Sequence, residues 1–368
     1  MDWTAEFLQM PWWWQLMLPL LTVLIVASIV QWLVFIVRFR TIWRQQPVAH
    51  LDQVSLILVG KNSEAQYGIW HERLRQCEWA EKMRIIMVDD QSTDRSAQAI
   101  LDLEKVDMMV HPVIVPLSER FDGTTKLAYT LGIKACRTEF AVIAHLRHHP
   151  PHDMEGWVRA MAAPLEQGAV ASWSWRQWPE DQGWKRAKHM MKFFQAAKRQ
   201  LVAKSPTGLV ASSFGLRTQA FFEVNGFLSH MHLNGGTIEF LLRDLAQIGP
   251  VVPVMQADAQ LEGRYHVSQD PRVRRERHGR ERISRTMTAW RHAVMLVCAG
   301  LLVVLSWSHA SSEVMMWFGR GTILAVPVLF LGSWVTWSIF IIRYYHGSML
   351  LWYPLIVVQS LFRNLIPS

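Results

Sequence analysis

Residues 84–94 read Arg-Ile-Ile-Met-Val-Asp-Asp-Gln-Ser-Thr-Asp. Four of the first five are apolar, as expected of a strand that is buried on both faces of a parallel sheet. The two carboxylates, Asp89 and Asp90, end this strand, and Thr93–Leu103 has the pattern of a helix. We therefore predict a strand–loop–helix unit that carries two adjacent acidic side chains at the carboxyl end of its strand.

Strands and helices alternate on both sides of this unit. We expect strands at 54–59, 113–116 and 140–144, and helices at 64–81 and 124–136. Because such alternation forms a parallel sheet, the fold class is α/β with a parallel-rich sheet, in a domain over residues 53–263. Ligands of these folds bind at the carboxyl ends of strands. At those ends the sequence has Lys61-Asn62, Asp89-Asp90 and His145-Leu146-Arg147.

The composition indicates a membrane protein. Of 368 residues, 51% are hydrophobic and only 18% are charged, whereas soluble domains carry about 25% charged residues. About 20 apolar residues cross the hydrocarbon core as a helix. Three uncharged runs are therefore candidates for transmembrane helices: 11–37, 293–308 and 321–342. The remaining segments would be an extracytoplasmic N-terminus, a juxtamembrane linker and an amphipathic interfacial tail, over residues 1–10, 38–52 and 347–368.

Arginines flank these runs on one side, which predicts a multi-pass protein of the cell membrane with the middle domain in the cytoplasm. The flanking residues are Arg38, Arg40, Arg44, Arg285, Arg291 and Arg343. The Arg-rich segment 264–291 then faces anionic lipid, or it binds a diphosphate or a lipid phosphate. The net charge is +8, yet no zinc-finger or RNA-binding motif is present, so we expect no nucleic acid partner. Three widely spaced cysteines indicate neither a disulfide framework nor a thiolate metal site.

Four segments, in this order, resemble the family-2 glycosyltransferases, which have the GT-A fold. They are Val88–Asp94; Lys126 with Ala128, Gly132, Ala135 and Glu139-Phe140; Phe214–Phe221 with Val224–Phe227; and Glu239–Leu242. The resemblance implies transfer of a sugar from a nucleotide-sugar donor to a lipid-linked or glycan acceptor. It also implies that the nucleotide is bound by Asp89, Asp90, Lys126 and Asn62.

The sequence departs from the family pattern at two places. Members of the family have an Asp-x-Asp motif that binds a divalent cation, but here those positions are His145 and Arg147. Because Mg²⁺ prefers oxygen ligands, a Mg²⁺ or Mn²⁺ cofactor is doubtful. The family's acidic base matches Thr237-Ile238. The adjacent Glu239 is either a displaced catalytic base or a carboxylate that favours a helix N-terminus.

Three hypotheses explain these departures. In the first, a metal-independent transferase neutralises the diphosphate with cationic side chains: Arg147, Lys126 and the arginine cluster that includes Arg277 and Arg280. In the second, a catalytically inactive relative binds a nucleotide, a glycan or partner proteins. In the third, a transition metal is bound by histidines, His145, His148 and His149, together with His152; a solvated His/Pro loop is the alternative. Four tryptophans would either stack on sugars or pack in the core or against the membrane: Trp173, Trp175, Trp178 and Trp184.

Overall fold

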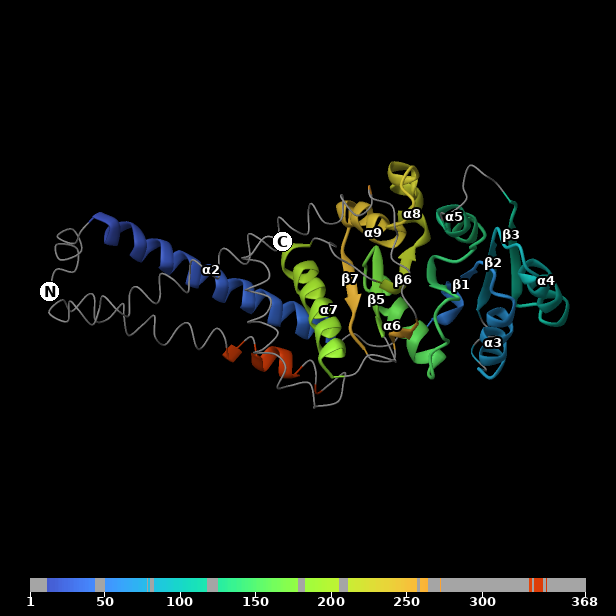
Figure 1. Ribbon diagram of the computed structural model, residues 1–368, viewed down its shortest axis with the longest axis horizontal. Coiled ribbons are helices and arrows are strands. Elements are labelled where there is room, and N and C mark those ends of the chain that lie inside the picture. The colour runs from blue at the N-terminus through green and yellow to red at the C-terminus, as the bar shows by residue number, and fades with distance from the viewer. Residues whose placement is uncertain are drawn as a thin grey trace. The chain divides into compact units, whose positions relative to one another are not determined.

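The computed structural model divides into two compact units, Phe39–Gly279 and Met1–Arg38 with Arg280–Ser368 (Figure 1). The structure describes residues 12–43, 50–77, 79, 83–117, 125–177, 183–204, 211–256, 259–263, 272, 331–332, 334–339 and 342. All or most of the residues in several predicted features therefore lie outside the described residues. These are the span 293–308, most of the span 321–342, the tail 347–368 and the segment 264–291 with Arg277 and Arg280.

Helix α2, Trp12–Trp43, contains the one stretch among the described residues that is long and apolar enough to cross a membrane, Thr22–Arg40. In the same unit, the Trp32 indole N–H donates a 3.0 Å hydrogen bond to Thr336 Oγ1. Gly332 lies against the Trp32 ring, where an added Cβ would come within 2.9 Å. Small residues and hydrogen bonds between helices are typical of helix contacts in membranes.

The unit Phe39–Gly279 contains a mixed α/β sheet, which confirms the α/β class. Its described strands are β1 Val54–Gly60, β2 Arg84–Asp90, β3 Val110–Val115, β4 Phe140–His145, β5 Ala171–Gln177, β6 Ala211–Arg217, β7 Val251–Val254 and β8 Leu261–Glu262. Their order is β3-β2-β1-β4-β6-β5-β7, and β8 pairs with β5. Strand β6 is antiparallel to both neighbours, whereas the other pairs are parallel.

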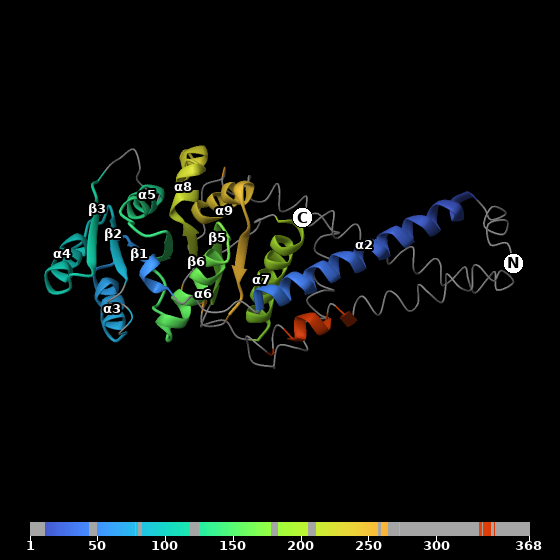
Figure 2. The same ribbon diagram turned by 180° about the vertical axis from the view of Figure 1, so that it is seen from behind.

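Helices cover both faces of this sheet. They are α3 Glu64–Arg75, α4 Ser96–Val106, α5 Lys126–Lys134, α6 Met154–Glu166, α7 Gly183–Ala203, α8 Thr218–Glu223 and α9 Thr237–Ile248. Figures 1 and 2 both show α5, α8 and α9 on one side of the sheet and α3 and α6 on the other. The predicted start of the second helix at Thr93 is wrong. Helix α4 begins at Ser96, because Asp94 Oδ1 accepts the Ser96 N–H and Thr93 is bonded to another loop.

Alternate side chains of the central strands build two cores. Leu56 and Met87 belong to the cluster that includes Trp70 of α3 and Trp157 of α6. On the other face α5 approaches so closely that a Cβ on Gly132 would lie 2.9 Å from both Ile57 and Val88. The continuous apolar strands are therefore explained by burial on both faces.

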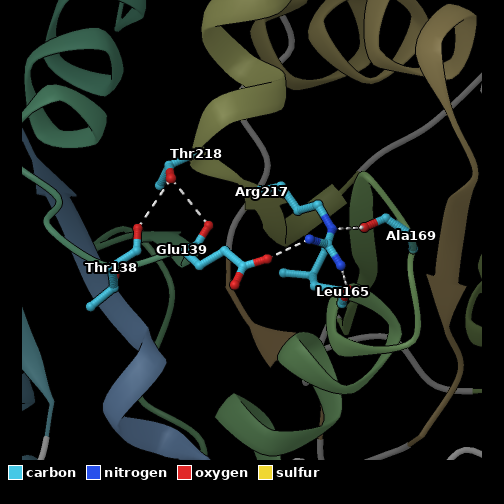
Figure 3. A network of polar contacts seen from close by, with 6 residues as sticks. All are labelled: Thr138, Glu139, Leu165, Ala169, Arg217 and Thr218. Atoms are coloured by element: carbon cyan, nitrogen blue, oxygen red, sulfur yellow. Dashed lines mark hydrogen bonds and ion pairs between the residues drawn. The ribbon is translucent and has the colours of Figure 1, made fainter.

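Arg217 joins three segments at the end of the sheet where β4 begins (Figure 3). Its guanidinium forms an ion pair with Glu139 and donates hydrogen bonds to the backbone carbonyls of Leu165, at 2.7 Å, and Ala169, at 3.2 Å. The Thr218 hydroxyl donates at 3.1 Å to the carbonyls of Thr138 and Glu139. This network fixes the end of β6 to the start of β4 and to the end of α6.

Replacing Arg217 with methionine should lower the free energy of unfolding by about 2 kcal/mol, because two carbonyls lose a charged donor. Thermal unfolding of the full chain in detergent measures this loss. The control is Arg75→Met, at an exposed position of α3, which should leave the midpoint nearly unchanged. Equal midpoints for the two variants would contradict a stabilising role for the Arg217 network.

Candidate nucleotide site

The carboxyl ends of β1, β2 and β4 meet at one edge of the sheet. In the register, Gly60 pairs with Asp89, and Val59 pairs with His145. The residues that follow these strands therefore lie together: Lys61-Asn62, Asp89-Asp90 and Leu146-Arg147. The structure thus brings the strand-end residues singled out in the sequence to a single edge.

Asn62 links the two loops at this edge. Its backbone N–H donates to Ser92 Oγ at 2.8 Å, and its side-chain Oδ1 accepts the backbone N–H of Thr93 at 2.8 Å. Asn62 and Gln91 both have left-handed backbones, with φ of 50° and 55°. These bonds hold the β1–α3 loop against the β2–α4 loop. Asn62, predicted to contact a nucleotide, therefore also shapes the edge through its own side chain.

Asp89 and Asp90 have unsatisfied oxygens at this edge. Each residue is only 2% exposed. Asp89 Oδ2 accepts the Ser92 N–H at 3.2 Å, but Oδ1 of Asp89 and Oδ1 of Asp90 have no hydrogen-bond partner among the described residues. Buried carboxylate oxygens are costly without a donor. Two such oxygens on successive residues at the end of β2 therefore indicate that a ligand supplies N–H or O–H groups here.

Cations from the neighbouring strands act on Asp90. Burial raises the pKa of the Asp90 carboxyl to about 6, while Lys61 and Arg147 oppose this rise and Asp89 adds to it. Lys61 follows β1, the neighbour of β2, and Arg147 follows β4, the next strand beyond β1, so both positive charges lie on the same side of the carboxyl pair. Beneath the edge, the Tyr67 hydroxyl donates to the Val88 carbonyl at 2.6 Å, and burial raises its pKa. No motif in the sequence had pointed to Tyr67.

The histidine-rich loop does not form a metal site in the described chain. His145 Nδ1 accepts the Arg147 backbone N–H at 3.1 Å, and the His149 backbone N–H donates to the Glu262 carbonyl at 2.8 Å. Among the described residues, which include His148, no three His, Cys, Asp or Glu side chains are grouped so as to hold a metal ion. The residues that follow β4 do not suit a hard divalent cation, because Arg147 is a permanent cation and His145 offers no carboxylate.

Lys126 lies at the start of α5 and is fully buried. Its ammonium donates to the backbone carbonyls of His230 and, at 2.6 Å, Leu233. This side chain, predicted to bind the nucleotide, therefore anchors the loop that precedes α9. A nearby polar cluster on the same loop and α9 adds to this anchoring, since Ser229 Oγ donates to Asp244 Oδ2 at 2.7 Å.

Glu239 lies in the first turn of α9 and is buried, with 8% of its surface exposed. Helix α9 is about 18 Å long, and only Gly249 and Pro250 separate it from the start of β7. Its N-terminus therefore lies toward the carboxyl ends of the strands. Glu239 thus faces the same end of the domain as Asp89 and Asp90, in the favourable field of a helix N-terminus.

The tryptophans divide between core and surface. Trp173 and Trp175 are buried on β5, and Trp175 stacks on Phe193 of α7 with ring centroids 5.2 Å apart. These two are therefore core residues rather than a sugar-stacking surface. Trp184 is half-buried, and Trp178 lies outside the described residues.

Comparison with known proteins supports a glycosyltransferase domain over part of the chain. Residues 69–224 match the family model of Glycosyl transferase family 2. This segment contains Asp89, Asp90, Lys126 and Arg147. Among curated protein sequences, none matches the chain significantly.

Solved structures of glycosyltransferases share a general likeness with the chain. A mannosyltransferase from Pyrobaculum calidifontis, in complex with GDP-Man and Mn²⁺, is 12% identical with a TM-score of 0.48; the match covers 94% of this chain and 99% of that one. Residues 1–349 of TarS from S. aureus are 13% identical with a TM-score of 0.46, over 82% and 91% of the two chains. These likenesses are too low to carry an argument about function. Over residues 69–224, the chain resembles glycosyl transferase family 2.

Proposed function

We propose that this protein transfers a sugar from a nucleotide-sugar donor to a membrane-linked acceptor. The observation that carries the proposal is the pair Asp89 and Asp90 at the carboxyl edge of the sheet, where the buried Oδ1 atom of each has no donor among the described residues. A nucleotide presents base N–H and ribose O–H groups that satisfy such oxygens. The pair also lies within the segment that matches the glycosyltransferase family.

The cations beside this pair suit the diphosphate of the donor. Arg147 can donate two parallel hydrogen bonds to a phosphate, and Lys61 adds a second positive charge from β1. In the proposed reaction these side chains stabilise the negative charge that develops on the leaving diphosphate. Glu239 is the proposed base that removes the proton of the acceptor hydroxyl. Arg277 and Arg280 remain proposed diphosphate ligands outside the described residues.

Membrane association is part of the proposal. The candidate span in α2 supports it, and so does the amphipathic helix α7. Helix α7 carries no Asp or Glu, and a stripe of cations recurs along it at spacings of three, four and seven residues: Lys185, Lys188, Lys192 and Arg199. Its opposite face, with Met190 and Phe194, is buried. A basic helix of this kind suits an anionic lipid surface. We place the α/β domain in the cytoplasm of a multi-pass membrane protein.

A titration of the purified full chain tests the donor. UDP, GDP and their sugars are added with and without Mg²⁺ or Mn²⁺, and binding and release of free nucleotide are both measured. We expect one nucleotide class to bind saturably and its sugar to be hydrolysed or transferred. Absence of binding by every nucleotide would reject the nucleotide site.

A second candidate function is that of a non-catalytic subunit that binds a nucleotide or a glycan. The presence of His145 and Arg147 at the family's cation-binding positions favours it. Nucleotide binding without transfer or hydrolysis of any nucleotide sugar would replace the first proposal with this one.

A further inference from the structure

A cluster of cationic side chains lies at the opposite end of the sheet from the proposed donor site. Arg84 begins β2, and Ile86, two residues later on the same face, pairs with His111 of β3. This is the face covered by α5, because Gly132 of α5 packs against Val88 of the same row. Arg137 follows α5 in the loop before β4 and acts electrostatically on both Arg84 and His111. Two arginines and a histidine therefore meet at the amino ends of β2 and β3.

The Arg84 guanidinium has no partner in the described part of the chain. Its Nε–H is buried and makes no hydrogen bond, and its side chain forms no ion pair there. Most partly buried arginines bind a carboxylate or a carbonyl, as Arg217 does, because a buried donor without a partner destabilises the fold, and a charged one does so more strongly. Arg84 thus presents five N–H donors that the described residues leave unused.

The charges next to Arg84 further disfavour its charged form. Burial lowers the pKa of Arg84, and Arg137 lowers it further. Burial also lowers the pKa of His111, and both arginines add to that effect, against a small opposing contribution from Glu104. The positive charges of Arg84 and Arg137 therefore repel each other when no anion is bound between them. An anion between the guanidinium groups would convert this repulsion into attraction.

Neutral hydroxyls lie at the same place. Arg84 pairs with Ser55 across the β1–β2 register, and Ser55 Oγ lies 2.7 Å from Thr138 Oγ1. Thr138 Oγ1 donates its hydrogen to the Phe140 carbonyl at 2.9 Å, so Ser55 is the donor within this pair and neither hydroxyl has a hydrogen left for an anion. The donors that the site offers to a phosphate are therefore the fork-shaped guanidinium groups.

We propose that Arg84, Arg137 and His111 form a binding site for an oxyanion of the phosphate class. The site is separate from the donor site, since Arg84 and Asp90 are at opposite ends of β2, roughly 20 Å apart at the usual rise of a strand. The inference does not depend on sugar transfer. The anion is either a free phosphate or the phosphate of a lipid headgroup, which share the same chemistry.

The test measures thermal unfolding of the full chain in a neutral detergent. Sodium phosphate replaces sodium chloride at constant ionic strength. We expect phosphate to raise the midpoint of the wild type in a saturable way. Arg84→Met should raise the apparent Kd for phosphate at least about tenfold, the effect of losing one charged hydrogen-bond partner. Arg137→Gln, at an exposed position, should weaken binding without affecting folding.

Two controls separate this site from other sources of phosphate binding. Arg75→Met tests the effect of losing a positive charge elsewhere on the surface, and Arg147→Gln tests phosphate binding at the proposed donor site. In both variants phosphate should still raise the unfolding midpoint. A short-chain phosphatidic acid that competes with phosphate in the wild type, but not in Arg84→Met, identifies the lipid source, and failure to compete identifies the free anion. The proposal is overturned if phosphate stabilises the wild type no more than chloride does. A response lost in Arg147→Gln but kept in Arg84→Met would also overturn it.

Discussion

Replacing Arg147 with alanine should lower the turnover of sugar transfer by about 10²–10³-fold, as losing one preorganised donor does in other active sites. In the proposed reaction the leaving diphosphate needs positive charge, and the sequence resemblance aligns Arg147 with a carboxylate that binds a cation in family-2 glycosyltransferases. The measurement is kcat at saturating donor in the presence of EDTA, for the wild type and the variant. We expect the wild type to remain active in EDTA.

Substitutions at the same position sharpen this test. Arg147→Lys keeps the charge but loses the fork of donors, so its activity should fall between those of the wild type and Arg147→Ala. Arg147→Asp should not recover activity when Mn²⁺ is added, because His145 supplies no matching carboxylate. Loss of wild-type activity in EDTA would contradict the role of Arg147 as the source of charge.

The central strands could be predicted because their sequences permit little else. Residues 54–59 and 84–88 are nearly continuous apolar runs, and both are buried on the two faces of the sheet. Helix ends were less predictable, since α4 begins where Asp94 accepts the Ser96 N–H rather than at Thr93. The antiparallel pairing of β6 with β4 joins residues 69 to 77 positions apart, from Ala144 with Ser213 to Phe140 with Arg217. No local pattern specifies such a partner.

The place of the candidate site was predictable, but the partners of its side chains were not. Asp89 and Asp90 end a buried strand, and parallel strands bring their carboxyl ends together. Lys126, in contrast, looks from the sequence like a ligand of a phosphate, yet it donates to carbonyls in a distant loop. Arg84 could not be singled out from the sequence, because its lack of a partner among the described residues depends on the three-dimensional arrangement.

Replacing Asp90 with asparagine should stabilise the fold above neutral pH and weaken nucleotide binding together. Burial raises the pKa of Asp90 from 3.8 to about 6, so the folded protein binds this proton more tightly than the unfolded chain. The stabilisation from this group is complete below about pH 4 and is lost as the pH rises through 6. At 1.36 kcal/mol per pKa unit, up to about 3 kcal/mol is lost. Asparagine does not ionise and avoids that loss.

Unfolding midpoints at pH 5 and pH 8 measure the first effect, and nucleotide titration at pH 8 measures the second. Affinity should fall about ten- to hundredfold, because the ligand loses a charged acceptor. Asp102→Asn is the matched control, since Asp102 pairs with Lys105 on the exposed surface of α4, where such pairs contribute little. A carboxylate retained only for the fold would make Asp90→Asn less stable and leave nucleotide affinity unchanged. If Asp90→Asn is more stable but binds nucleotide more weakly, then the Asp90 carboxylate destabilises the fold in the absence of ligand. The hydrogen bonds from a bound ligand would then compensate for that destabilisation.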